Sequence, residues 1–356
     1  MPYCRRCGTQ LVEDARFCHK CGTPAITYNP PTAPAPSKPL PPLSKDPFVI
    51  GAVALVAILV IAVVIAALFV APFATWSTSS SFADSTEGIK TLNLNFDTDV
   101  GRVTVFTSKI GDNNIGIFIQ GNGSRGISGG ENPLSVTFTN QTAGNELFVD
   151  VKVAVEDALS GTANVVCQIY VDPALNLNLN VTSTTGQVSF SADKPTTIQS
   201  ITLRATTGEV EAHLQSNVTV AGNLSLSTTT GAVNYRMAET NIVGNCSLNL
   251  QSTTGSVTMD ITQTRTLQGN LEVEAETVTG SINVGLTIDG GVGAKITSDT
   301  NAFGDINTNL NNFTGSKSHL QSANYPAASN IEINNRVTGI GSIYINANYK
   351  TQTIAH

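Results

Sequence analysis

The stretch that decides the fold is STTGQVSF at residues 183–190, because its pattern returns four times further along the chain. The later copies read ATTGEVEA at 205–212, TTTGAVNY at 228–235, STTGSVTM at 252–259 and TVTGSINV at 277–284. Successive glycines, from Gly186 to Gly280, stand 22, 23, 24 and 25 residues apart. A degenerate copy at 302–308 and a terminal variant at 336–345 follow. Repetition with a period of about 20 to 50 residues is typical of repeat architectures.

Each repeat predicts two short strands joined by a tight turn at the glycine. Before the glycines, apolar residues alternate with polar ones, as in LNLNLNV at 175–181 and LEVEAE at 271–276. Alternation puts one face of a strand inward and the other outward. So short a unit cannot bury its apolar face alone, and copies must stack. The sequence therefore predicts a β-solenoid, a parallel β-helix, over residues 181–350. Antiparallel sandwiches with hairpins at each Thr-Gly step are the competing fold.

Residues 89–180 show a different pattern of strand-like runs separated by Gly- and Asn-containing loops. Examples are RVTVF at 102–106 and NVVCQIYV at 164–171. We expect this region to form an antiparallel or mixed β cap that covers the first edge of the solenoid, because an uncovered edge invites pairing with other chains.

The stretch VDPALNLNLNVTSTTGQVSF at 171–190, together with its successors, resembles the putative-adhesin β-solenoid family, DUF4097, over about residues 148–284. A strand ending in Val-x-Pro, an alternating run and repeated TTG-x-V steps carry this resemblance. It implies display on a surface and a role in adhesion. It implies no reaction.

An uninterrupted apolar run, FVIGAVALVAILVIAVVIAALFVA, occupies residues 48–71. As a helix it would be about 36 Å long, enough to cross a hydrocarbon core of about 30 Å. A cleaved signal peptide fits less well, because the run is too long and begins too far from Met1. Six basic residues precede the run, and Lys90 is the only one within about 20 residues after it. These features predict a single-pass plasma-membrane protein with a cytoplasmic N-terminus and an extracellular C-terminal region.

Two further expectations concern the residues that follow the predicted span. Trp76 stands just beyond it, where an aromatic side chain can anchor at the membrane interface. Residues 72–88 are rich in Ser and Thr, and we expect them to form a polar stalk.

The N-terminal residues 1–26 contain two Cys-x-x-Cys-Gly knuckles, with Cys4 and Cys7 in the first and Cys18 and Cys21 in the second. Four thiolates are what a closed tetrahedral zinc site requires. The segment YCRRCGTQLVEDARFCHKCGT resembles the short zinc-ribbon family, which implies these four cysteines as ligands of a structural Zn²⁺. A pair of disulfides or redox dithiols is the alternative. Of the segment between the knuckles, only Leu11, Val12 and Phe17 are available as core, so metal binding would supply the folding free energy.

Eight prolines between Pro30 and Pro47 favour an extended, semi-rigid spacer over residues 27–47. A ligand for an aromatic groove is the other interpretation, because PLPP at 39–42 fits PxxP loosely.

Composition and charge exclude several classes. Charged residues make up only 13% of the chain, which is too few for a coiled coil, and 41% hydrophobic residues are too many for a disordered chain. The net charge is −7, divided into +3 before residue 47 and −10 from there on. Nucleic acid is therefore not an expected partner, because phosphate binding needs a basic surface.

The region after the span shows little sign of catalytic chemistry. Its histidines, of which His213 is expected to point outward, stand near no recognisable nucleophile motif. Glu272, Glu274 and Glu276 alternate on one strand and could hold Ca²⁺ with help from an aspartate, Asp260 or Asp289. A solvated acidic stripe is the competing interpretation. We expect Cys167 and Cys246 to be buried free thiols, because nothing in the sequence fixes their separation.

These observations predict a membrane-anchored, non-enzymatic surface protein whose solenoid binds an extracellular glycan or envelope component. The lipid bilayer is the expected partner of residues 48–71. An alternative is a transmembrane sensor whose zinc ribbon docks a cytoplasmic protein. A carbohydrate-active enzyme is a further alternative, which would need a clustered carboxylate pair with a basic neighbour.

Overall fold

The computed structural model describes residues 3–4, 6–11, 17–21, 74–125, 133–156, 162–301 and 303–350. The chain divides into two compact units, Met1–Ala71 and Pro72–His356. The predicted linker at 27–47 and the predicted membrane span at 48–71 lie outside the described residues. Within the described ranges, no helix is long and apolar enough to cross a membrane.

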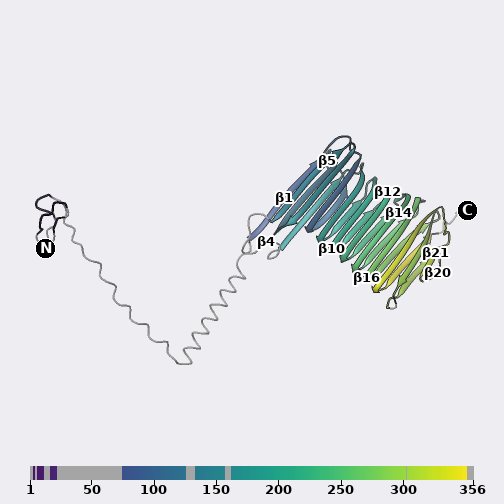
Figure 1. The fold of residues 1–356 in the computed structure, drawn as a ribbon. Coiled ribbons are helices and arrows are strands. Elements are labelled where there is room, and N and C mark those ends of the chain that lie inside the picture. Colours follow the sequence, from purple (N-terminus) through teal and green to yellow (C-terminus); the bar gives the residue numbers. More distant parts are fainter. Residues whose placement is uncertain are drawn as a thin grey trace, which may run out of the picture. The chain divides into compact units, whose positions relative to one another are not determined.

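The described part of the second unit consists of two long sheets of eleven and twelve strands (Figure 1). In spatial order, the eleven-stranded sheet contains β1 (Ala74–Asp84), β4 (Ile115–Arg125), β7 (Thr162–Val171), β3 (Arg102–Thr107), β9 (Val188–Ala192), β11 (Val210–Leu214), β13 (Val233–Ala238), β15 (Val257–Gln263), β17 (Ile282–Asp289), β23 (Ile343–Lys350) and β19 (Ile306–Asn311). The twelve-stranded sheet contains β20 (Phe313–Ser316), β21 (His319–Ser322), β18 (Val292–Thr300), β22 (Ser329–Ile340), β16 (Gln268–Thr279), β14 (Asn241–Thr254), β12 (Val218–Thr230), β10 (Thr196–Thr207), β8 (Asn176–Thr185), β2 (Thr91–Val100), β6 (Glu146–Val155) and β5 (Leu134–Ala143).

Each repeat forms one coil, which gives one strand to each sheet. The first repeat runs along β8, turns at Gly186 and continues along β9, and the next does the same along β10 and β11. β8 pairs in parallel with β10, and β9 pairs in parallel with β11. The prediction of a β-solenoid is therefore confirmed. The sandwich alternative is wrong, because the two strands of a repeat lie in different sheets instead of forming a hairpin.

The repeated glycines stack into one column and set the geometry of the turns. From Gly186 to Gly280 their φ angles lie between 142° and 145°, a backbone conformation that L side chains rarely adopt. A Cβ atom added at Gly208 would lie only 1.7 Å from the carbonyl oxygen of Gly186. In three of the coils a buried hydroxyl three residues before the glycine supports the stack by donating to the glycine carbonyl of the preceding coil at 3.0 Å; these hydroxyls belong to Thr228, Ser252 and Thr277. The TTG pattern thus reflects contact between backbones.

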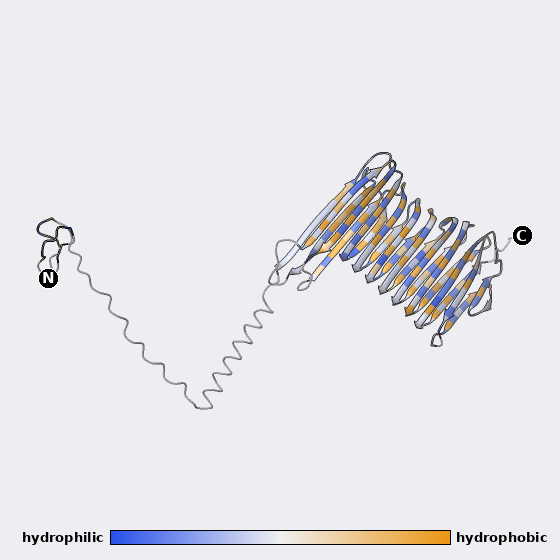
Figure 2. Cartoon of the chain, in the orientation of Figure 1, coloured by the Kyte–Doolittle hydropathy of each residue, from blue (hydrophilic) through white to orange (hydrophobic). Residues whose placement is uncertain are grey.

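The interior between the sheets is filled by Val, Ile and Leu, which form one continuous core. Figure 2 shows the alternation of apolar and polar residues along the strands. The burial of β8 follows it, because Leu177, Leu179 and Val181 are buried while the intervening asparagines are not. The predicted alternation is confirmed.

The N-terminal end of the solenoid differs from the expected cap. β2 and β3 form a coil of their own around Gly101, which stacks under Gly186. β6 and β7 pair in parallel with β2 and β3 on the outer side, so the parallel sheets begin at residue 91 and not at 181. Among the described strands at this end, the antiparallel pairs are β1 with β4, β4 with β7, and β5 with β6. This first coil could not be recognised from the sequence, because its glycine, Gly101, is not preceded by the TTG pattern.

The residues expected to form a stalk include a strand. β1 pairs with β4 over eleven residues, and the expectation of a stalk is wrong for this part of 72–88. Trp76 does not lie free as an interfacial anchor but is buried in the core. Its ring occupies the space above Gly121 and Gly123, where an added Cβ would approach it to 2.7 and 2.8 Å.

The C-terminal coils are stacked in a different order from the sequence. Gly341 lies against Gly280, and Gly304 lies against Gly341. The terminal variant of the repeat, β22 and β23, is therefore inserted between the fifth repeat and the coil of β18 and β19. The antiparallel strands β21 and β20 extend the twelve-stranded sheet beyond β18.

Candidate metal centre and candidate binding groove

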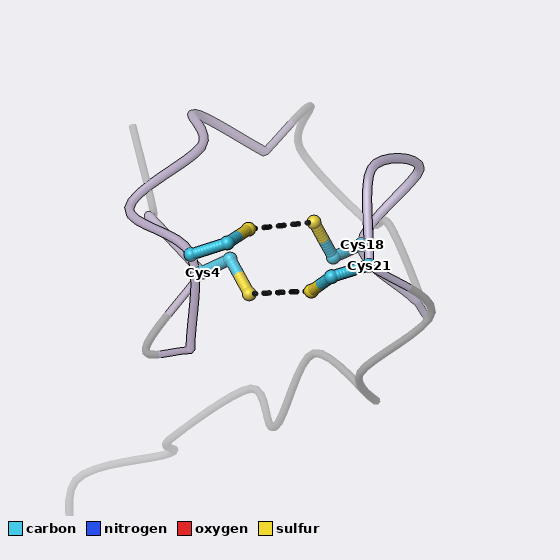
Figure 3. Close-up of side chains that lie close together, drawn as sticks. Cys4, Cys18 and Cys21 are labelled. Carbon is cyan, nitrogen blue, oxygen red and sulfur yellow. Dashed lines mark hydrogen bonds between the residues drawn. The ribbon is translucent and has the colours of Figure 1, made fainter.

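The four N-terminal cysteines converge on one point. The Sγ atoms of Cys4 and Cys21 are 3.5 Å apart, and those of Cys7 and Cys18 are 3.6 Å apart. All four ligand atoms lie within 4.8 Å of one another. Figure 3 shows the sulfur atoms facing each other across the two knuckles. The cysteines are free thiols, so the disulfide alternative is not what the structure shows.

This donor set fits zinc. A tetrahedral ion with Zn–S bonds of about 2.3 Å separates its sulfur ligands by about 3.8 Å, close to the contacts found here. Hydrogen bonds from the hydroxyl and the backbone of Thr9 lower the pKa of the Cys7 thiol to about 6. A backbone hydrogen bond from Lys20 tends to lower the pKa of Cys18, but burial and the neighbouring Cys7 and Cys21 thiols outweigh it and raise this pKa to about 11. The cluster indicates a structural Zn²⁺, with Cys4, Cys7, Cys18 and Cys21 as its predicted ligands. Four protein sulfurs leave no open coordination position for catalysis.

The small core of the ribbon is only partly as predicted. Leu11 is buried beside Cys4 and Cys18, whereas Phe17 is 62% exposed and Tyr3 is 63% exposed. Val12 lies outside the described residues. The ribbon therefore presents two aromatic side chains to its surroundings.

The outer face of the twelve-stranded sheet carries rows of hydrogen-bonded polar side chains. Asn178 donates to Asn93 at 2.9 Å, and Asn180 donates to Asn95 at 2.8 Å. The parallel register aligns like residues of successive coils, so each row runs across the strands. This gives a long polar surface of the kind that the outward asparagines predict.

A groove of about 370 Å³ opens on this face over β12, β14, β16 and β22. Two rows of side chains line it. An amide row consists of Asn245, Asn270 and Asn330, and a carboxylate row, two residues further along the strands, contains Glu272 and Glu332. Asn223 of β12 lies at the end of the groove.

Hydrogen bonds fix the amide row. Asn270 donates to Asn245 at 3.2 Å and accepts a hydrogen bond from the backbone N–H of Asn330 at 2.9 Å. In the carboxylate row, the Tyr325 hydroxyl donates to Glu332 at 2.8 Å. Glu272 is exposed and has no hydrogen bond or ion pair within the described part of the chain.

Extra residues in successive strands create the groove. Between matched pairs, β10 advances from Ile198 to Ser200 while β12 advances by three residues, which leaves one extra residue in β12. Between β12 and β14 the matched pairs are Val220 with Ile242 and then Leu224 with Leu248. Here β12 advances by four residues and β14 by six, so β14 has two residues more than β12. The strands therefore bulge at this corner. Extra residues in longer repeats thus shape this part of the surface.

The predicted calcium site receives no support. Glu272, Glu274 and Glu276 do point outward from β16, as expected. However, the four cysteines are the only group of three or more metal-binding side chains that the described residues bring together. Asp260 and Asp289 belong to strands of the other sheet, which separates them from the three glutamates. The acidic stripe is the interpretation that agrees with the structure.

The remaining predictions about single residues agree with the structure. His213 lies on the outer face of β11, with its ring nitrogen 3.1 Å from the Glu211 carboxylate. Cys167 and Cys246 are buried and free. Burial raises the pKa of Cys167 to about 12, so this thiol is unreactive at neutral pH.

Comparison with known proteins identifies a short N-terminal segment as a known domain and gives the rest of the chain only a distant likeness. Residues 3–25 match the zinc-ribbon domain family. No curated protein sequence matches the chain. The chain is similar to the crystal structure of a putative cell adhesion protein from Clostridium sporogenes, at 16% identity over 76% of this chain and 100% of that one, with a TM-score of 0.40. It is also similar to a putative adhesin from Bacteroides fragilis, at 14% identity over 76% of this chain and 97% of that one, with a TM-score of 0.30. The N-terminal segment is thus a zinc ribbon, joined in one chain to a largely parallel β-solenoid.

Proposed function

We propose that the protein is a non-enzymatic surface protein whose solenoid binds glycans or other envelope components outside the cell. In this proposal a single helix at 48–71 anchors the chain in the plasma membrane, and the ribbon lies in the cytoplasm. The observation that carries the proposal is the long outer face of hydrogen-bonded Asn, Ser and Thr rows, such as Asn93 with Asn178. Such a face offers many donors and acceptors without an enclosed site.

Retention on cell surfaces tests the binding function. The fragment should begin at Pro72, because a cut after Trp76 would remove part of β1 and a buried side chain of the core. We expect the fragment 72–356, which is one compact unit, to be retained saturably on isolated envelope. Lack of retention on envelope and on intact cells alike would contradict the proposal.

Proteolysis of intact cells tests the topology. A protease added outside should cleave the solenoid region and leave an epitope tag on the N-terminal ribbon intact. Because a folded solenoid can resist cleavage, a protease site inserted at Gly144 gives a defined target. This glycine lies in the turn between β5 and β6, with nothing within 4 Å of where its Cβ would be. Cleavage of the N-terminal tag instead would show that the topology is wrong.

A second candidate function is that of a sensor, and the exposed Tyr3 and Phe17 of the ribbon favour it. Aromatic side chains are enriched where proteins contact each other. The test is co-purification of a cytoplasmic protein with the full chain and its loss on Phe17→Ser, with zinc content unchanged.

The enzyme alternative also gains an observation, because Glu272, Glu332 and Lys295 are neighbours in register across β16, β22 and β18. This is a carboxylate pair with a basic neighbour. Glu272 is exposed, however, and the groove that it lines is open, whereas an acid catalyst of this class usually lies in an apolar pocket. Release of reducing ends from a polysaccharide by the fragment would favour the enzyme over the binding protein.

A further inference from the structure

We propose that the groove over β12, β14, β16 and β22 is a subsite for neutral hexose units of a polysaccharide, held through their hydroxyl groups. This inference rests on the proposed function and assigns its glycan binding to one place on the solenoid. The groove differs from the rest of the polar face because the bulges of β12 and β14 hollow it.

The two rows offer complementary groups across a short span. Amide side chains supply N–H donors, whereas ionised carboxylates only accept hydrogen bonds. Asn245 uses its oxygen to accept from Asn270, so its N–H₂ group is the part directed to other partners. Glu272 supplies acceptors about 7 Å from the amide row, because it stands two residues beyond Asn270 along β16. A sugar hydroxyl both donates and accepts, and a ring placed between the rows meets both kinds of group.

Charge and size favour neutral sugars over other ligands. Glu272 and Glu332 would repel uronic acids and sulfated sugars, and Lys295 offsets only part of their charge. Among the side chains that line the groove, only Leu271 and Cys246 are apolar, which disfavours a lipid or an apolar peptide. The volume of about 370 Å³ lies within the range of small-molecule sites, about 300 to 1,000 Å³.

The direction of the groove suits a chain of sugars. Four strands in sequence across the sheet cover three inter-strand steps, which is about 14 Å. Because both rows run across the strands, a polymer would lie along the solenoid axis and repeat its contacts from coil to coil. Asn330 and Glu332 of β22 complete the groove, although they stand about 60 residues further along the chain than their neighbours in β16.

The test measures binding of the fragment 72–356 to soluble polysaccharides by affinity electrophoresis and calorimetry. The probes are the neutral hexose polymers mannan, dextran and galactan, the amine-bearing chitosan and the uronate alginate. The variants are Glu272→Gln and Asn245→Ala. Glu274→Gln is the matched control, because Glu274 points outward from the same strand but does not line the groove. Circular dichroism and thermal unfolding verify that each variant folds.

We expect a neutral polymer to bind and Glu272→Gln to raise its Kd about tenfold, the effect of losing a hydrogen bond to a charged group. Asn245→Ala should weaken binding by at least about threefold, and Glu274→Gln by less than about twofold. Addition of EDTA should change nothing. Tighter binding of alginate, loss of binding with EDTA, or equal effects of Glu272→Gln and Glu274→Gln would overturn the assignment of the groove.

Retention on envelope separates this inference from the proposed function. If the fragment is retained on envelope but binds no neutral polymer, or if Glu272→Gln is retained as well as the parent, the groove is not the site and the binding function stands. If the fragment binds neither envelope nor any polysaccharide, both are wrong.

Discussion

Replacement of Gly208 by alanine is the sharpest test of the glycine column. The added Cβ would lie 1.7 Å from the Gly186 carbonyl oxygen, whereas real Cβ atoms essentially never approach within 3.0 Å. The coils would have to separate by 3.0 − 1.7 = 1.3 Å at this point. The neighbour is backbone and belongs to a coil that is itself stacked, so it cannot move alone.

The cost of Gly208→Ala follows from what the separation breaks. Two backbone hydrogen bonds join these two coils beside the turn, from Gly186 to Thr207 at 2.8 Å and from Val188 to Glu209 at 2.9 Å. Their weakening costs about 1 kcal/mol each. The strained φ of 142° adds about 1 to 3 kcal/mol. We therefore expect the free energy of unfolding of the fragment 72–356 to fall by about 3 to 5 kcal/mol.

The control for this prediction is Gly144→Ala. Gly144 also has a positive φ, of 63°, but nothing lies within 4 Å of where its Cβ would be. The control should lose only about 1 to 2 kcal/mol, the cost of the left-handed conformation. Urea unfolding followed by circular dichroism gives both values. If Gly208→Ala costs no more than Gly144→Ala, the stacking of the glycines is not what constrains the turn.

Three further predictions follow from other parts of the chain. Purified full-length protein should release about one Zn²⁺ per chain when its thiols are titrated with a mercurial, and Cys18→Ser should abolish this release without changing the thermal midpoint of the solenoid. A metal-free ribbon that stays folded by NMR would contradict it. Thr277→Val should cost about 1 kcal/mol, because the buried hydroxyl donates to the Gly255 carbonyl. Thr107→Val should cost nothing or stabilise, because that hydroxyl is buried without a partner in the described structure; similar losses in urea unfolding would refute the difference. Burial tends to raise the pKa of Asp84, but hydrogen bonds from Thr86, Asn140 and Asn114 outweigh it and hold the pKa below its ordinary value. The carboxylate therefore stabilises the fold above the ordinary aspartate pKa of about 4, and this stability is lost as the pH falls through the lower folded value. Asp84→Asn should flatten the fall in stability below about pH 4, and an unchanged pH profile would show that Asp84 does not carry it.

The solenoid could be predicted because its constraint is local and repeated. A glycine that must take a positive φ imposes the same few letters on every central coil. In three of these coils a hydroxyl three residues earlier also donates to the glycine carbonyl of the preceding coil. The metal centre could be predicted for the same reason, since two residues between cysteines let both sulfurs reach one ion.

The ends and the groove could not be predicted, because they depend on contacts between distant residues. Gly101 lacks the TTG pattern, and its partner Gly186 stands 85 residues away. Trp76 was assigned to a membrane interface from its place after an apolar run, whereas glycines on β4 make room for its ring in the core. The groove joins residues of β12, β14, β16 and β22, and no single stretch of sequence contains it.

The order of the end coils bears on how the length of this molecule can change. In the central coils, from β8 to β17, neighbours in sequence are also neighbours in space, so one repeat could be duplicated or deleted there without altering any other connection. At the N-terminal end the coil of β2 lies between β6 and β8, and at the C-terminal end the coil of β22 lies between β16 and β18. A coil duplicated there would separate strands that now pair, and the connecting segments would have to change. We therefore expect homologous chains to differ in length by whole repeats between residues 176 and 289 only. The polar outer face can lengthen while both ends keep their order of strands.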